Sequence, residues 1–122
     1  MNKINHFEDF AAWQKARELC KTVSVLTKKD LFNRDLKFSA QVRDSSGTIM
    51  DSIAVGSEQT NTEEFVRYLI NAKSSCGGLK SQLHRAMDLN YINKGEFAST
   101  YSQAEEISML IQSQIQELKS QQ

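Results

Sequence analysis

The stretch that decides the fold runs from Gln41 to Leu83, QVRDSSGTIMDSIAVGSEQTNTEEFVRYLINAKSSCGGLKSQL. Its second half carries small or apolar residues at alternating steps of four and three, at Phe65, Leu69, Ala72, Cys76, Leu79 and Leu83. This spacing places one unbroken apolar seam on a single helical face. The first half has helical spacing too, at Val42, Ile49, Ile53 and Gly56, before the polar turn SEQTN. The stretch therefore predicts two long antiparallel helices.

The rest of the chain has the same helical pattern. We expect helices over residues of about 6–29, 34–56, 62–90 and 94–119. N-caps are expected at Asn5, Asn33 and Asn93, and Asn93 forms a capping box with Glu96. The third helix has either Thr60 with Glu63 or Asn61 with Glu64 as its capping box. Gly56 stands where a left-handed C-terminal residue is wanted. Short connections make sequential helices antiparallel. The prediction is an all-α protein, an antiparallel up-down-up-down four-helix bundle that occupies residues 1–122 as a single domain.

Composition supports helices and excludes some partners. The chain has no proline and only five glycines in 122 residues, which favours helix over sheet. Its fifteen basic and fifteen acidic residues cancel, so no global field attracts nucleic acid or an anionic membrane. Cys20 and Cys76 lie far apart on apolar faces, where buried free thiols are expected. With no signal-like start and no membrane-length apolar run, we expect a cytoplasmic protein.

Catalytic motifs are missing from this sequence. His6 precedes the first helix and His84 lies beside the apolar seam, so neither matches the inward Glu-x-x-His spacing of a di-iron bundle. The acidic pairs 63–64 and 105–106 fall at a helix start and on a solvated face, where they serve the helix better than acid-base chemistry. No glycine-rich loop follows a strand. We expect no enzymatic activity, no metal and no cofactor.

Some outward-facing residues fit a subunit interface. Gly77 and Gly78 interrupt the third helix opposite its seam, which indicates either a bend or the close approach of another backbone. Ile70, Met109 and Leu110 place apolar side chains on the outer sides of the two C-terminal helices. This clustering favours self-association.

Basic residues on the second and third helices raise the alternative of nucleic-acid binding. Arg43, Arg67 and Lys73 are the candidates for phosphate or partner contacts. Interleaved acidic residues dilute this basic stripe, so a solvated face of mixed charge is the competing interpretation.

The chain also resembles a known family. FEDFAAWQKARELC is similar to a Phe-x-Asp-Leu-x-x-Trp-Gln-x-Ala start, and further matches occur at Gln41, Arg43, Ile49, Ile53, Ala54, Gly56, Glu64, Phe65, Arg67, Leu69, Ala72, Ser75, Leu79, Gln82 and Leu83. These residues resemble the 23S rRNA intervening-sequence proteins, or S23 ribosomal proteins, which include the accessory proteins of diversity-generating retroelements. The resemblance implies a homopentamer, and accessory members bind a reverse transcriptase and RNA or DNA through basic surfaces. Several polar family positions differ here, including Asp44, Ser52, Val55, Gln59 and Gly78.

Two functions follow as expectations. The leading one is a non-enzymatic, oligomeric interaction protein that scaffolds a protein or ribonucleoprotein partner. The alternative is direct RNA or DNA binding through a local basic surface. Salt dependence separates them, because phosphate contacts weaken steeply as salt rises whereas an apolar interface changes little.

Overall fold

The computed structural model describes residues 6–121, and the regular structure in this range is helical. The elements are the 3-10 helix η1 (Phe7–Asp9) and the α-helices α1 (Ala11–Thr27), α2 (Asp30–Arg34), α3 (Leu36–Ser57), α4 (Thr62–Asp88) and α5 (Lys94–Ser120). The prediction of an all-α protein is confirmed.

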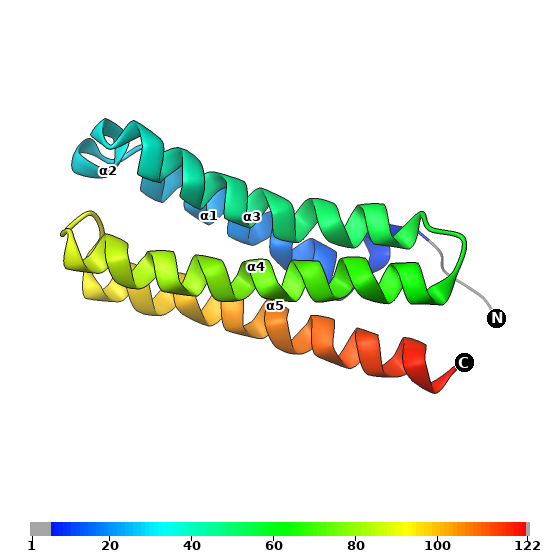
Figure 1. Cartoon of the computed structure of the whole chain (residues 1–122). Coiled ribbons are helices and arrows are strands. Elements are labelled where there is room, and N and C mark those ends of the chain that lie inside the picture. The colour runs from blue at the N-terminus through cyan, green and yellow to red at the C-terminus, as the bar shows by residue number, and fades with distance from the viewer. Residues whose placement is uncertain (1–5, 122) are drawn as a thin grey trace.

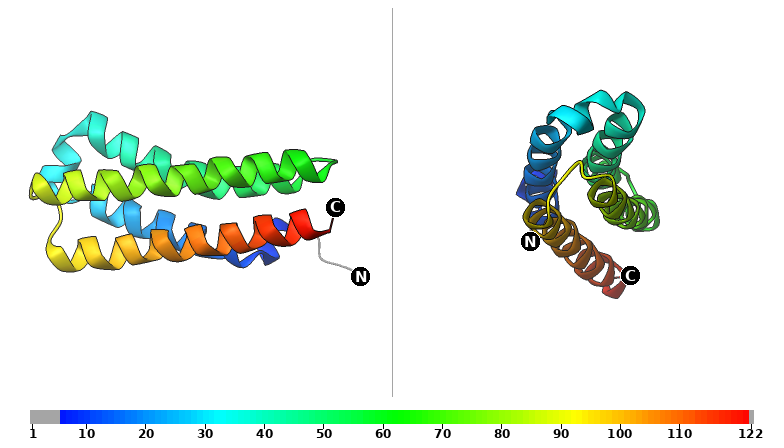
Figure 2. Two further views of the ribbon diagram at one scale, coloured as in Figure 1. Left: turned by 60° about the horizontal axis from the view of Figure 1, so that its bottom comes forward. Right: turned by 90° about the vertical axis from the view of Figure 1, so that its left-hand side faces the viewer.

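The four long helices lie around one apolar core. α3 packs against α1 and α4, and α5 packs against α4 and α1, so each long helix has two neighbours. The colour gradient in Figure 1 shows the chain reversing direction between successive long helices. The end view in Figure 2 shows α2 crossing from α1 to α3 at one end of the bundle.

The first helix begins later than the sequence pattern predicted. Phe10 adopts an extended conformation (φ −75°, ψ 128°) and separates η1 from α1, so the expected start near His6 is wrong. Phe7 and Trp13 then meet edge to face with ring centroids 5.1 Å apart. The proposed cap Asn5 lies outside the described residues.

The link before α3 also differs from expectation. Asn33 does not cap the second long helix, because it lies inside the short helix α2. Asp35 is the cap, and its Oδ1 accepts a hydrogen bond from the Phe38 amide at 3.2 Å. α2 forms because Phe32 has to enter the core, where it is almost fully buried.

The residue with a left-handed backbone conformation is not the one that the sequence predicted. No glycine among residues 6–121 has a positive φ, whereas Asn90 has φ 62°, so the left-handed role expected for Gly56 is wrong. Tyr91 N donates to Ala86 O at 2.9 Å and Asn90 N to Met87 O at 3.0 Å, which is the Schellman pattern at a helix C-terminus. Gly56 instead lies within α3, where α4 comes closest.

The core contains the seam that the sequence showed. Leu69, Ala72, Cys76 and Leu79 of α4 are fully buried. Facing helices contribute branched side chains to the same cluster, including Leu19, Val23, Ile49, Ile53, Ile107 and Ile111. Burial of this one continuous surface is the main stabilising term of the bundle.

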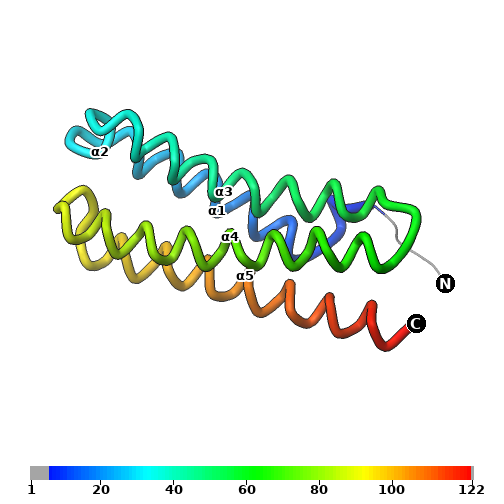
Figure 3. The backbone as a smooth tube through the Cα atoms, in the orientation of Figure 1, coloured from blue at the N-terminus to red at the C-terminus, as the bar shows by residue number. Residues whose placement is uncertain are grey.

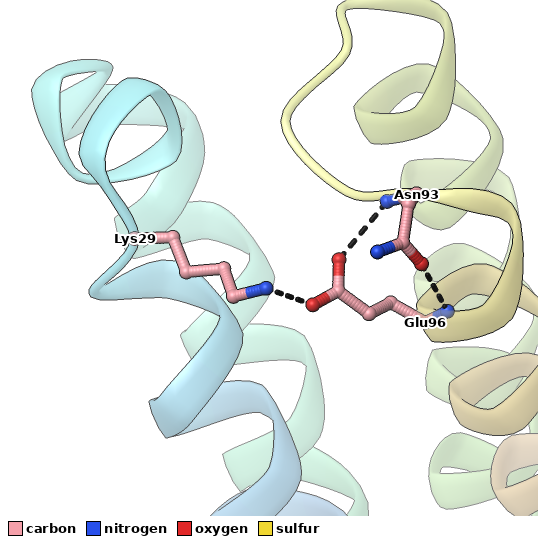
Figure 4. A network of polar contacts seen from close by, with 3 residues as sticks. All are labelled: Lys29, Asn93 and Glu96. Atoms are coloured by element: carbon pink, nitrogen blue, oxygen red, sulfur yellow. Dashed lines mark hydrogen bonds and ion pairs between the residues drawn. The ribbon is translucent and has the colours of Figure 1, made fainter.

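Polar and aromatic contacts close the end of the bundle that carries α2. Figure 4 shows Lys29, after α1, pairing with Glu96, at the start of α5. Glu96 also accepts from the Asn93 amide at 2.9 Å, while Asn93 Oδ1 accepts from the Glu96 amide at 2.8 Å, which completes the predicted capping box. Nearby, the Tyr91 hydroxyl donates to Asp35 Oδ2 at 2.8 Å, and this bond raises the pKa of the Tyr91 phenol.

The opposite end of the bundle is more open. The tube in Figure 3 shows the C-terminal part of α5 diverging from α4. Grooves follow the divergent part of α5 on both sides, one towards α4 and one towards the start of α1. The two ends therefore differ: polar contacts close the end that carries α2, and grooves flank α5 at the other end.

The glycines provide a test of this packing. A Cβ on Gly56 would lie 2.8 Å from Tyr68 Cβ and 3.0 Å from the Phe65 ring. We expect Gly56→Ala to lower the free energy of unfolding by about 1–3 kcal/mol, because α3 and α4 would have to separate. Gly47, also in α3, has no atom within 4 Å of the same position, so Gly47→Ala should raise stability by about 0.4–1 kcal/mol.

Urea unfolding of the two variants measures this difference in sign. Equal stabilisation of both variants would show that α3 and α4 are not held in close contact at Gly56.

Candidate interaction site

The outer side of α4 carries an uncovered strip of small and apolar residues. It contains Ile70, Ser74, Gly77, Gly78 and Ser81, all exposed and spaced to share one side of the helix. We call this set the outer strip of α4. A Cβ added to Gly77 or Gly78 would meet nothing within 4 Å, so neither glycine is required by packing within this chain.

Large apolar side chains accompany the strip. Ile70 is 48% exposed on α4 and Met109 is 64% exposed on α5. Each is an apolar side chain that the fold leaves in solvent, and α4 and α5 are neighbouring helices. Water is thus in contact with apolar area that a second surface would cover.

Leu110 does not share this outer position. It is half-buried and packs against the core, lining a groove with Phe10 and Ala12 beside the start of α1. The expectation that Leu110 faces outward is wrong, because the core face of α5 is centred on Ile107 and Ile111, and Leu110 lies at its α1 edge.

Two of the predicted basic residues border adjoining grooves between α4 and α5. Lys73 lines a groove of about 350 Å³ that also contains Ile70 and Lys119. Arg67 lines the next groove, of about 410 Å³, again with Lys119. We call these two spaces together the α4–α5 groove. Lys119, which the sequence patterns did not single out, joins Arg67 and Lys73.

Acidic groups limit the positive potential of the α4–α5 groove. Arg67 Nη1 lies 3.3 Å from Glu64 Oε2, and Glu63 lines the same groove. Further along, Lys80 pairs with Glu105 at 2.6 Å, and this hydrogen bond raises the pKa of Lys80. Lys73 and Lys119 form no ion pair with a described acidic side chain.

Arg43 lies elsewhere on the molecule. It is exposed on α3 and lines neither part of the α4–α5 groove. The three predicted basic residues therefore do not form one cluster, and the structure brings together Arg67, Lys73 and Lys119.

The titratable side chains that could act in catalysis are dispersed. Among residues 6–121, no three His, Cys, Asp or Glu side chains gather as metal ligands would. His84 is exposed and its ring packs at a tilt against Phe97 and edge to face against Tyr101, with ring centroids 4.8 and 5.8 Å away. Cys20 donates its Sγ hydrogen to the Ser46 carbonyl at 3.3 Å. The His84 ring is therefore held by packing, and the Cys20 thiol by a hydrogen bond.

The comparison with protein families assigns the chain. The sequence model of the family described as 23S rRNA-intervening sequence protein matches residues 8–113. The chain belongs to this family. The resemblance seen in the opening helix and the central stretch is thereby confirmed. No curated protein sequence gives a significant match.

The described helices of this 23S rRNA-intervening sequence family member include none with the length and apolar character needed to cross a bilayer. The outer strip and the α4–α5 groove are two of its exposed features.

The buried position of Cys76 predicts a slowly reacting thiol. Burial raises the pKa of its thiol from 9.0 to about 11, so the reactive thiolate is scarce at pH 8. We expect Cys76 to react with iodoacetamide about a hundredfold more slowly in the folded protein than in urea. Peptide mass spectrometry after timed alkylation measures this rate.

The same shift predicts a pH dependence of stability. The neutral thiol is the form that folding favours, so its contribution is fully present below pH 9 and is lost as pH rises towards 11. The free energy of unfolding should therefore fall more between pH 9 and pH 11 in the wild type than in Cys76→Ala.

In the alkylation experiment, rapid reaction of Cys76 in the folded protein at pH 8 would contradict its buried position.

Proposed function

We propose that this protein is a non-enzymatic, oligomeric helical bundle that scaffolds a protein or ribonucleoprotein partner. The observation that carries the proposal is the outer strip of α4, where Gly77 and Gly78 lie in a long helix with no packing role within the chain. Each exposed helical glycine costs about 1 kcal/mol relative to alanine. A second helix backbone lying against the strip explains why small residues occur there.

The occupant that we propose for the strip is a second copy of this chain. Ile70 within the strip and Met109 on the neighbouring helix α5 add exposed apolar area, and the zero net charge removes the repulsion that would oppose association of identical copies. A contact between unlike surfaces closes into a ring when the rotation between copies allows it. The family resemblance implies five copies. Free thiols at Cys20 and Cys76 fit a reducing compartment such as the cytoplasm.

Light scattering coupled to size exclusion tests self-association. We expect a mass near five times the chain mass of 13.9 kDa at micromolar concentration. Met109→Glu should reduce that mass, because a carboxylate would lose its hydration in the contact. Val25→Glu is the matched control, since Val25 is also 64% exposed but lies on α1, and it should leave the mass unchanged.

Circular dichroism of both variants checks that they remain folded. A wild-type mass of 13.9 kDa throughout the range would refute self-association, and an equal loss of mass in both variants would place the contact elsewhere.

Direct RNA or DNA binding is the second candidate function. It is favoured by the convergence of Arg67, Lys73 and Lys119 on the α4–α5 groove. We expect dissociation constants in the non-specific range of about 10⁻⁴ to 10⁻⁶ M, because only a few phosphates are contacted in a protein without net charge. Fluorescence anisotropy with a labelled RNA measures this affinity.

The substitution Lys73→Ala together with Lys119→Ala should weaken RNA binding and reduce the salt slope by about one for each phosphate that is no longer neutralised. Arg43→Ala is the control outside the groove. Nanomolar affinity at physiological salt that depends on the two lysines would make nucleic-acid binding the leading function, and equal effects of all three residues would indicate diffuse attraction.

A further inference from the structure

The groove between α5 and the start of α1 combines apolar side chains with free carboxylates. Its volume is about 360 Å³, and its apolar lining includes Phe10, Ala12 and Leu110. The charged residues that line it are Asp9 and Glu117, both exposed, and no described lining residue is basic. Neither carboxylate forms an ion pair with a described side chain. We call this space the α1–α5 groove.

The α1–α5 groove defines what a partner has to present. Phe10 and Leu110 are only half-buried, so part of their apolar area stays in contact with water that a second surface would displace. The neighbouring carboxylates favour cationic groups on that surface and disfavour phosphates, which rules against nucleic acid as the occupant of this groove. A fitting partner therefore carries an exposed apolar side chain close to unpaired lysine or arginine side chains.

The opposite side of α5 displays such a set. Ile70 is 48% exposed, and it lines one part of the α4–α5 groove together with Lys73 and Lys119. Neither lysine forms an ion pair with a described acidic side chain. Ser74, next to Ile70 on the outer strip, is small and exposed, so another surface can approach α4 closely there. The two sides of α5 thus carry apolar surfaces with opposite free charges.

The two surfaces also lie at the same level of the bundle. Gln112, Ile115 and Lys119 line the side of α5 towards α4, whereas Leu110 and Glu117 line the side towards α1. All five belong to the orange and red part of α5 in Figure 3. Glu117 and Lys119 differ in level by two residues, about 3 Å at 1.5 Å per residue. Rotation about an axis parallel to the bundle leaves levels unchanged, so it brings these two side chains of neighbouring copies opposite each other.

We propose that the α1–α5 groove of one copy receives Ile70 of the next copy, with Lys119 facing Glu117 across the contact. Lys73, on the same surface as Ile70, then lies towards Asp9. Burial of apolar area drives the association, and the charges determine which surfaces meet, because two like surfaces would bring charges of one sign together. The match in both charge and level identifies a second copy of this chain as the occupant. Each copy then uses both sides of α5, one for each neighbour.

This inference rests on the proposed self-association and names the two surfaces that meet. A wild-type mass of 13.9 kDa would refute self-association and this pairing together. Assembly that Met109→Glu breaks, while the charge reversals described next leave it intact, would refute the pairing alone.

The test exchanges the two facing charges and follows assembly by light scattering over a dilution series of the full chain. Lys119→Glu places two carboxylates opposite each other, and Glu117→Lys places two ammonium groups there. Each single variant should raise the midpoint concentration of assembly about tenfold or more, because like charges face each other in the contact. The double variant, Glu117→Lys with Lys119→Glu, has opposite charges again and should recover the wild-type midpoint.

Arg43→Glu is the control, because it changes the net charge as much as Lys119→Glu does but lies exposed on α3, outside both surfaces. It should keep the wild-type midpoint, and circular dichroism checks that all variants remain helical. The pairing is overturned if neither single reversal raises the midpoint, if the double variant fails to recover it, or if Arg43→Glu raises it equally. A wild-type assembly of only two chains would also overturn it, because unlike surfaces leave both ends of a pair open to further copies.

Discussion

The structure depends on burying one face of α4. Its 27 residues form a rod of about 40 Å, and its buried face from Val66 to Ala86 has to be covered along most of that length. No single helix does this, so α3 covers one side and α5 the other, and α1 closes the remaining side of the core against both. Gly56 is small because α3 approaches α4 closely at that level. The remaining helix positions, the short connections and α2 follow from keeping the seam out of water.

The two ends of the bundle satisfy their polar groups differently. At the α2 end, Asp35 both caps α3 and accepts the Tyr91 hydroxyl, and Glu96 joins its own cap to Lys29. Each carboxylate thus connects two elements, which fixes the positions of the helix ends relative to one another. At the other end, α5 continues past the region where it packs closely on both neighbours.

The long helices are predictable from the sequence because their seams are long and regular, whereas short segments are not. α2 is five residues long, too short for periodicity to appear, and only the burial of Phe32 reveals why it forms. The left-handed residue follows α4, at Asn90, and Gly56 in α3 is a close-contact glycine instead. A glycine in a sequence signals either a left-handed turn or a close contact, and spacing does not distinguish them. Leu110 was expected on the outer side of α5, but the core face is centred on Ile107 and Ile111, and Leu110 lies at its edge.

The candidate sites are harder to predict for a related reason. Arg67 and Lys73 are visible as charges, but Lys119 joins them only because α5 runs beside α4, and that proximity is a tertiary fact. Gln82 occupies a place where the α4 seam borders α3, and the sequence alone gives no sign that its amide oxygen lacks a partner. Contacts of this kind depend on how α3 and α4 come together, and a single sequence gives the side chain without its neighbours.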